Sequence, residues 1–183
     1  MRLKKGDTKE KLINIAKNIK LVIFDVDGVL TDGSIILDNK GNEFKLFHVR
    51  DGHGIKMLIK AGITVAMITG RYSKVIERRA LELGIKEVYQ KCHDKRIAFR
   101  HLIEKYSVDP KEVAYIGDDI VDLPLLKMSG FSASVADGSV EAKNASKIIT
   151  KNRGGRGAVR EVCEFILKAK GFWKDIIDEY SKT

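Results

Sequence analysis

Two aspartates, Asp25 and Asp27, directly follow the short apolar run at residues 21–24. This run is uniformly apolar and partly β-branched, as is typical of a buried strand. Residues two apart on a strand share a face, and ligands bind at the carboxyl ends of strands in open α/β sheets. Two like charges repel there unless a cation lies between them, and oxygen ligands suit Mg²⁺. The first carboxylate could act as a nucleophile and the second as a proton donor.

The elements that must position these acids alternate along the chain. Strands alternating with helices predict a Rossmann-like α/β fold, in which helices cover both faces of a parallel sheet. Asp51 is expected to cap the second helix, and residues 109–112 resemble a capping box with proline at the first helical position. Strands are predicted at 21–24, 63–69, 88–90, 113–116, 131–135 and 147–150, and helices at 7–18, 51–62, 73–83, 94–106 and 157–170.

Length and composition indicate a single domain over residues 1–183, with 44% hydrophobic and 32% charged residues. No apolar stretch approaches the about 20 residues of a membrane span, and the N-terminus lacks the apolar region of a secretory signal.

Two cysteines, Cys92 and Cys163, give no disulfide framework and fit the cytoplasm. The net charge of +9 is dispersed and no nucleic-acid motif is present, so an anionic small substrate is favoured over nucleic acid.

A β-hairpin is expected at about residues 32–49, inserted directly after the strand that carries the two acids. Its turn signal is the segment 38–42. An exposed two-stranded ribbon is marginal alone, and pairing with other copies would protect its edges. We therefore expect a homo-oligomer. A C-terminal loop and tail occupy about residues 151–183.

Four segments in order resemble the motifs of the haloacid dehalogenase superfamily of phosphotransferases. They are residues 25–31, 67–71 and 117–122, with Lys95 placed like the third motif. Lid domains in this superfamily are usually inserted between the first two motifs or after the second. Neither gap here has room for one, so the resemblance implies a member without a cap domain.

This resemblance implies a role for five residues. Asp25 would be the nucleophile that forms an aspartyl-phosphate, and Asp27 would protonate the leaving oxygen and then activate water. Asp25, the backbone carbonyl of Asp27 and Asp118 would bind Mg²⁺ as the cofactor. Thr69 would hold the phosphoryl group, and Lys95 would offset charge in the transition state.

Two further acids, Asp119 and Asp122, follow Asp118 closely. They could be direct metal ligands, but we expect them to hold metal-bound waters or Lys95 instead. Mn²⁺ or Co²⁺ could replace Mg²⁺, depending on supply and geometry.

Over most of its length the chain also resembles a narrower family, the phosphatases of 3-deoxy-D-manno-octulosonate (KDO) 8-phosphate. This resemblance implies hydrolysis of that phosphorylated sugar acid in lipopolysaccharide synthesis by a homotetramer. The segments that carry it are 31–33, 48–56, 69–71, 78–80, 117–124 and 154–161.

The same resemblance places the substrate among residues of several segments. Guanidinium groups suit its phosphate and carboxylate because they pair with either in a bidentate manner. Arg156, in the loop at 151–157, would meet the substrate of a neighbouring subunit. The implied substrate-binding residues are Asp27, His48, Val49, Arg50, Asp51, Gly52, Lys56, Arg71, Arg79 and Lys95.

Three alternatives remain open from the sequence. The substrate could be a related sialic acid 9-phosphate or another phosphosugar, because such enzymes share the phosphoryl machinery. Similar domains also occur as non-catalytic tetramerisation modules of sugar-nucleotide synthetases, which loss of the nucleophile or acid would mark; here Asp25 and Asp27 are present. Salt-sensitive binding without sequence preference would indicate a nucleic-acid-binding protein.

Overall fold

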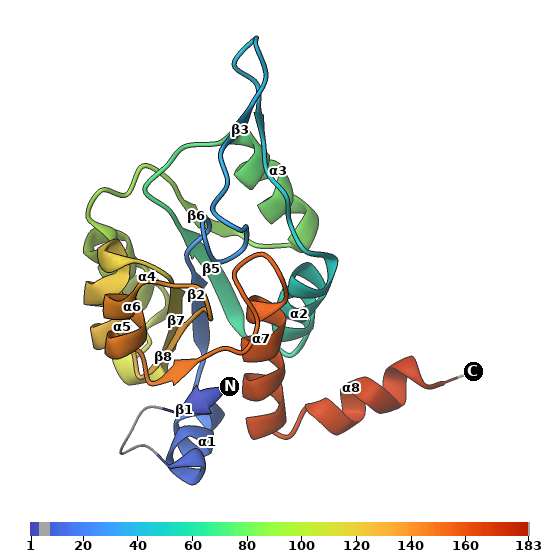
Figure 1. Cartoon of the computed structure of the whole chain (residues 1–183). Helices are drawn as coiled ribbons and strands as arrows, with labels where there is room; N and C mark the ends of the chain where they lie inside the picture. The colour runs from blue at the N-terminus through green and yellow to red at the C-terminus, as the bar shows by residue number, and fades with distance from the viewer. Residues whose placement is uncertain (4–7, 183) are drawn as a thin grey trace.

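A seven-stranded sheet in the order β1-β9-β8-β7-β2-β5-β6 forms the centre of the structure, a computed structural model that describes residues 1–3 and 8–182 (Figure 1). All neighbouring strands are parallel except β1, which pairs antiparallel with β9 at one edge. The predicted parallel sheet is therefore confirmed, with one antiparallel edge strand that the sequence did not suggest. The strands are β1 (Arg2–Leu3), β2 (Leu21–Phe24), β5 (Thr64–Ile68), β6 (Glu87–Tyr89), β7 (Val113–Gly117), β8 (Phe131–Ser134) and β9 (Ile148–Ile149).

Helices cover both faces of the sheet (Figure 1). Alternate residues of β2 point to opposite faces, so Val22 and Phe24 join one core cluster while Leu21 and Ile23 join the other. The first cluster packs under α1 (Lys9–Lys17), α2 (Val49–Lys60), α3 (Lys74–Leu83) and α7 (Ala158–Ala169). The second packs under α4 (Lys95–Tyr106), α5 (Leu123–Met128) and α6 (Val140–Ala145). No helix within residues 1–3 and 8–182 is long and apolar enough to cross a membrane.

The hairpin consists of β3 (Ile36–Leu37) and β4 (Glu43–Phe44), an antiparallel pair that projects from the body beyond the carboxyl end of the sheet (Figure 1). Asp38 closes its turn by accepting the backbone N–H groups of Lys40 and Asn42 at 2.8 Å each. The predicted hairpin is confirmed. Between β2 and β5 the chain forms only this hairpin and α2, as expected of a protein without a cap domain.

Several boundaries differ from the sequence prediction. The capping box at Asp109 is present, but it begins a single 3-10 turn, η1 (Pro110–Glu112), instead of an α-helix. The tail forms an exposed helix, α8 (Trp173–Tyr180), which extends away from the sheet (Figure 1). The prediction that Asp51 caps its own helix was wrong, because α2 already begins at Val49 with His48 at the capping position.

Asp51 instead caps a different helix. Its side chain is buried, and its two carboxylate oxygens accept the N–H groups of Gly157 at 3.1 Å and Arg160 at 2.7 Å. These donors belong to the first turn of α7, whose capping glycine has no side chain to offer. The local sequence suggested a helix start correctly, but the helix that needs the carboxylate lies more than a hundred residues further along the chain.

We expect Asp51→Ala to lower the free energy of unfolding by about 2 kcal/mol, because two buried N–H groups lose their acceptor. Asp51→Asn retains one acceptor oxygen and should cost clearly less. Urea denaturation of both variants measures the difference. A raised KM without a loss of stability would instead support the substrate-binding role that the family resemblance implies for this residue.

Candidate active site

Three neighbouring strands deliver the central polar groups to one edge of the sheet. In the register of the sheet Phe24 lies beside Met67 on one side and Ile116 on the other, so β2, β5 and β7 end close together. The residues that follow these strands include Asp25, Thr69 and Asp118. Their meeting is a direct consequence of parallel pairing, because the carboxyl ends of parallel strands lie on the same edge.

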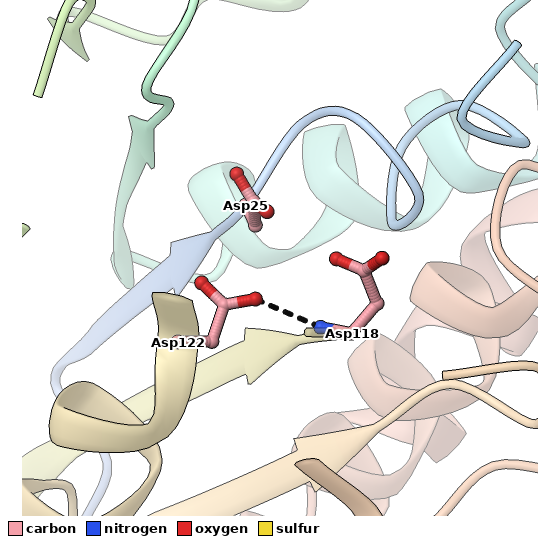
Figure 2. Close-up of side chains that lie close together, drawn as sticks. All are labelled: Asp25, Asp118 and Asp122. Carbon is pink, nitrogen blue, oxygen red and sulfur yellow. Dashed lines mark hydrogen bonds between the residues drawn. The ribbon is translucent and has the colours of Figure 1, made fainter. Parts of the chain in front are cut away.

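Oxygen atoms of Asp25, Asp118 and Asp122 all lie within 4.8 Å of one another (Figure 2). Burial and the neighbouring charge of Asp122 raise the pKa of Asp25 well above its usual range. The same two causes raise the pKa of Asp118 to about 7. Carboxylates crowded in this way suit a divalent cation, which would stabilise their ionised forms.

Gly28 keeps the space beside these acids open. Its backbone has a φ of +87°, and a Cβ placed there would lie 2.2 Å from Asp118 Oδ2. A side chain at this position would therefore displace the carboxylate from the cluster. The oxygen donors and the open space together fit Mg²⁺, with Asp25 and Asp118 available as carboxylate ligands.

Asp122 has a different environment from the other two acids. Its Oδ1 accepts hydrogen bonds from the Tyr115 hydroxyl at 2.5 Å and from Lys95 Nζ at 2.6 Å. Its Oδ2 accepts the backbone N–H groups of Asp118 at 2.9 Å and Asp119 at 3.2 Å. Because both oxygens of this fully buried side chain are occupied, we read Asp122 as an acid that orders the site and not as a direct ligand.

Lys95 pairs with two of the three acids in this cluster. Its Nζ lies 2.9 Å from Asp25 Oδ1 and 2.6 Å from Asp122 Oδ1, at the start of α4. Burial by itself would lower the pKa of this ammonium group, but the two carboxylates outweigh burial and raise it. Lys95 is therefore charged in this site and points at the oxygen expected to attack phosphorus.

Thr69, Arg71 and Lys95 share a cleft of about 280 Å³ with Asp25, Asp27 and Asp118. The Thr69 hydroxyl accepts the N–H of Arg71 at 3.2 Å and lies 3.4 Å from Asp27 Oδ2. Asp119, which is exposed, lines the same cleft. A phosphoryl group placed here would meet cations and hydroxyl or backbone donors as well as the acids.

Two residues of the hairpin, Glu43 and Lys45, also reach this site and were not predicted. Lys45 contacts Asp27 Oδ1, and Glu43 accepts a hydrogen bond from Arg71 at 2.9 Å. Alternation along the strand at 43–46 could have indicated that these two residues share a face. Nothing in the local sequence indicates which face that is.

The other predicted substrate residues lie outside the cleft in the single chain. His48, Asp51, Gly52 and Arg79 surround a small space of about 10 Å³. Arg50 and Arg156 line a separate cleft of about 590 Å³, where Arg156 pairs with Asp32 of its own chain at 3.2 Å. Val49 and Lys56 are exposed on α2. Their binding of substrate stays a prediction, as does the action of Arg156 on a neighbouring subunit.

The loop at 151–157 packs against the turn that follows β2. The N–H of Gly155 donates to the carbonyl of Val29 at 2.9 Å, and Gly154 donates to Asp137 Oδ1 at 2.9 Å. Gly154 lies so close to this turn that a Cβ on it would come within 1.7 Å of the Gly28 carbonyl oxygen. Glycine is therefore required here for the loop to support the turn between Asp27 and Thr31.

Comparison with known proteins gave consistent matches. The family model for haloacid dehalogenase-like hydrolases matches residues 76–162. The KDO 8-phosphate phosphatase KdsC of Escherichia coli K12 is 46% identical over 166 residues, which are 91% of this chain and 88% of the relative. The corresponding enzyme of Yersinia pestis is 47% identical over 165 residues, with 90% and 88% covered.

Solved structures of such phosphatases resemble this chain in both sequence and fold. The phosphatase of Moraxella catarrhalis, crystallised with magnesium, phosphate and KDO, superposes with a TM-score of 0.93 at 43% identity, over 95% of this chain and all of the other. The Yersinia pestis phosphatase gives a TM-score of 0.89 at 46% identity, over 90% of this chain and 89% of the other.

Proposed function

This chain belongs to the family of KDO 8-phosphate phosphatases, within the haloacid dehalogenase-like hydrolases, and we propose that it hydrolyses KDO 8-phosphate to KDO and phosphate with Mg²⁺. The convergence of Asp25, Thr69, Lys95 and Asp118 in one cleft carries this proposal. The Moraxella relative holds magnesium, phosphate and KDO. The product, a free sugar acid, would serve lipopolysaccharide synthesis.

In the first half-reaction an Asp25 oxygen attacks phosphorus while the bond from phosphorus to the sugar oxygen breaks. The sugar oxygen takes its proton from Asp27, and Asp25 is left as an aspartyl-phosphate. In the second half-reaction Asp27 takes a proton from water, whose oxygen attacks phosphorus and releases phosphate and the Asp25 carboxylate.

The remaining residues lower the barrier to these steps. Lys95 would neutralise charge that develops on the phosphoryl oxygens, and Thr69 would orient them. Asp25, Asp118 and the Asp27 carbonyl would hold Mg²⁺, which would reduce the repulsion between the anionic nucleophile and an anionic phosphate. Asp122 would keep Lys95 and the backbone of Asp118 in place, which agrees with the contacts described above.

Phosphate release from a panel of phosphorylated sugars and sugar acids, with Mg²⁺ and with chelator, tests this function. We expect kcat/KM for KDO 8-phosphate to exceed that for a sialic acid 9-phosphate by about tenfold or more, since a pocket built for one polyol rejects another through unpaired polar groups. Weak release from every compound would contradict the named substrate. No release from any compound would contradict the proposed phosphatase activity.

We further propose a homotetramer that assembles through the hairpin and works in the cytoplasm, where the free Cys92 and Cys163 stay reduced. In the single chain four apolar side chains of the hairpin are more than half exposed, and a second copy would bury them. They are Ile35 (58%), Leu37 (60%), Phe44 (54%) and Leu46 (57%).

Light scattering of a Leu37→Ser/Phe44→Ser variant tests this assembly. We expect the mass to fall from that of the tetramer towards the 20.5 kDa of one chain, because the change removes apolar area from the contact. Leu81→Ser, on an exposed face of α3, is the control and should leave the mass unchanged. A tetramer that survives the double substitution would place the contact elsewhere.

A further inference from the structure

Lys45 is a buried cation that no part of the mechanism above uses. Only 1% of its side chain is exposed, although it lies on a projecting hairpin. Lysine is rarely buried without a partner, because desolvating the ammonium group is costly. Its Nζ contacts Asp27 Oδ1 and lies 3.4 Å from Glu43 Oε1, so both of its neighbours are carboxylates.

We propose that Lys45 is a positioning residue for Asp27, which holds one carboxylate oxygen so that the other faces the phosphoryl site. A lysine ammonium group donates hydrogen bonds and accepts none. The oxygen that it contacts, Oδ1, therefore stays an acceptor. Oδ2 is left to give a proton to the leaving oxygen and later to take one from water.

The position of Oδ2 agrees with this assignment. It lies 3.4 Å from the Thr69 hydroxyl and 4.0 Å from Arg71 Nε, and both of these residues line the cleft. Lys45 does not line the cleft, so it acts through Asp27 and does not touch the substrate. Glu43 links the two cations around Asp27, because it pairs with both Lys45 and Arg71.

Strand alternation connects this role to the hairpin. Glu43 and Lys45 contact Arg71 and Asp27, which line the cleft, whereas Phe44 and Leu46, which alternate with them, are exposed. The segment at 43–46 thus places charges against residues of the cleft on one side and the proposed contact with other copies on the other. Its register decides where the Lys45 ammonium group lies relative to Asp27.

This inference rests on the proposed phosphatase activity, and its test separates the two. The enzyme and the variants Lys45→Met and Lys40→Met are compared on KDO 8-phosphate, whose leaving oxygen needs a proton, and on p-nitrophenyl phosphate, whose leaving group departs as a stable anion. The quantity measured is kcat/KM, because it covers the steps up to departure of the leaving group and excludes the later hydrolysis of the aspartyl-phosphate.

We expect Lys45→Met to lower kcat/KM about 100-fold on the sugar phosphate and less than about fivefold on p-nitrophenyl phosphate, since only the first reaction depends on the acid. Lys40→Met, at the exposed tip of the same hairpin, should change neither value. In an Asp27→Asn background, Lys45→Met should cause no further loss, because its effect passes through Asp27.

An equal loss on both substrates, or an additive loss in the Asp27→Asn background, would overturn the role of Lys45 while leaving the phosphatase intact. If the unmodified enzyme turns over neither substrate, the proposed function is overturned and this inference with it. Lys45→Leu, which is also neutral and has no hydrogen-bond donor, gives the same comparison if Lys45→Met does not fold.

Discussion

Asp25→Asn is expected to lower kcat by about 10⁴-fold or more while the fold stays intact. The amide oxygen of asparagine is a far weaker nucleophile than a carboxylate, and the change also removes one charge from the predicted metal site. Asp25 is buried beside Asp122, and these surroundings raise the pKa of Asp25. Its ionised form is therefore unfavourable in the metal-free protein, and the neutral amide should not lower the melting temperature.

Asp178→Asn is the matched control, because Asp178 is exposed on α8, away from the cleft. Turnover and thermal melting of both variants are measured in the same buffer. Trapping of the phosphorylated enzyme gives a second readout. A labelled phosphoryl group should accumulate on the unmodified chain and be absent from Asp25→Asn. Retained turnover in Asp25→Asn would exclude Asp25 as the nucleophile.

The convergence of Asp25, Thr69 and Asp118 could be predicted because each follows a short apolar run that the sequence clearly marks as a strand. A parallel sheet then brings the ends of such runs to one edge without further information. The register of β2 with β5 and β7 bears this out. Lys95 was harder to place from residue types alone, because a lysine at a helix start is usually exposed; its position relied on the family resemblance.

The contacts that could not be predicted depend on how separate segments dock. Asp51 has the residue type and place of a helix cap, yet the N–H groups that it satisfies belong to Gly157 and Arg160. Lys45 directly follows β4 in a segment where charged and apolar residues alternate, and this pattern does not show that the charged side meets Asp27. In both cases the local pattern defines a chemical group correctly, while its partner is set by tertiary packing.

The positions of four expected substrate residues also could not be predicted from local patterns. They are Arg50, Lys56, Arg79 and Arg156. Their expected roles came from resemblance and not from a local pattern, and in the single chain none of them lines the cleft with Asp25. Arg50 and Arg156 nevertheless share a cleft of their own. If copies assemble through the hairpin, the surfaces that carry these residues could meet the cleft of another chain. The variants that dissociate the proposed tetramer would then also raise KM.

Binding of Mg²⁺ is expected to release the protons held by the carboxyl groups that bind it, at least one of them near neutral pH, which makes binding strongly pH-dependent. Burial and the charge of Asp122 raise the pKa of Asp118 to about 7 in the metal-free protein. In the unfolded chain the Asp118 carboxyl group titrates near its ordinary pKa of 3.8. Ionisation of Asp118 therefore destabilises the metal-free fold as the pH rises from this value to about 7. The cation reverses the effect, because it binds only the ionised form.

The apparent dissociation constant for Mg²⁺ should therefore rise at least about 30-fold between about pH 8 and about pH 5.5, which is the change expected for the Asp118 proton alone with a pKa near 7. The stabilisation that Mg²⁺ gives should be larger at the higher pH for the same reason. Titration calorimetry in buffers of different ionisation enthalpy measures both the affinity and the proton released. Asp178→Asn should behave like the unmodified chain, whereas Asp118→Asn should bind Mg²⁺ more weakly and release one proton fewer. An affinity that is equal at both pH values would show that the acids are already ionised before the cation arrives, and that burial in this cleft does not hold a proton on Asp118.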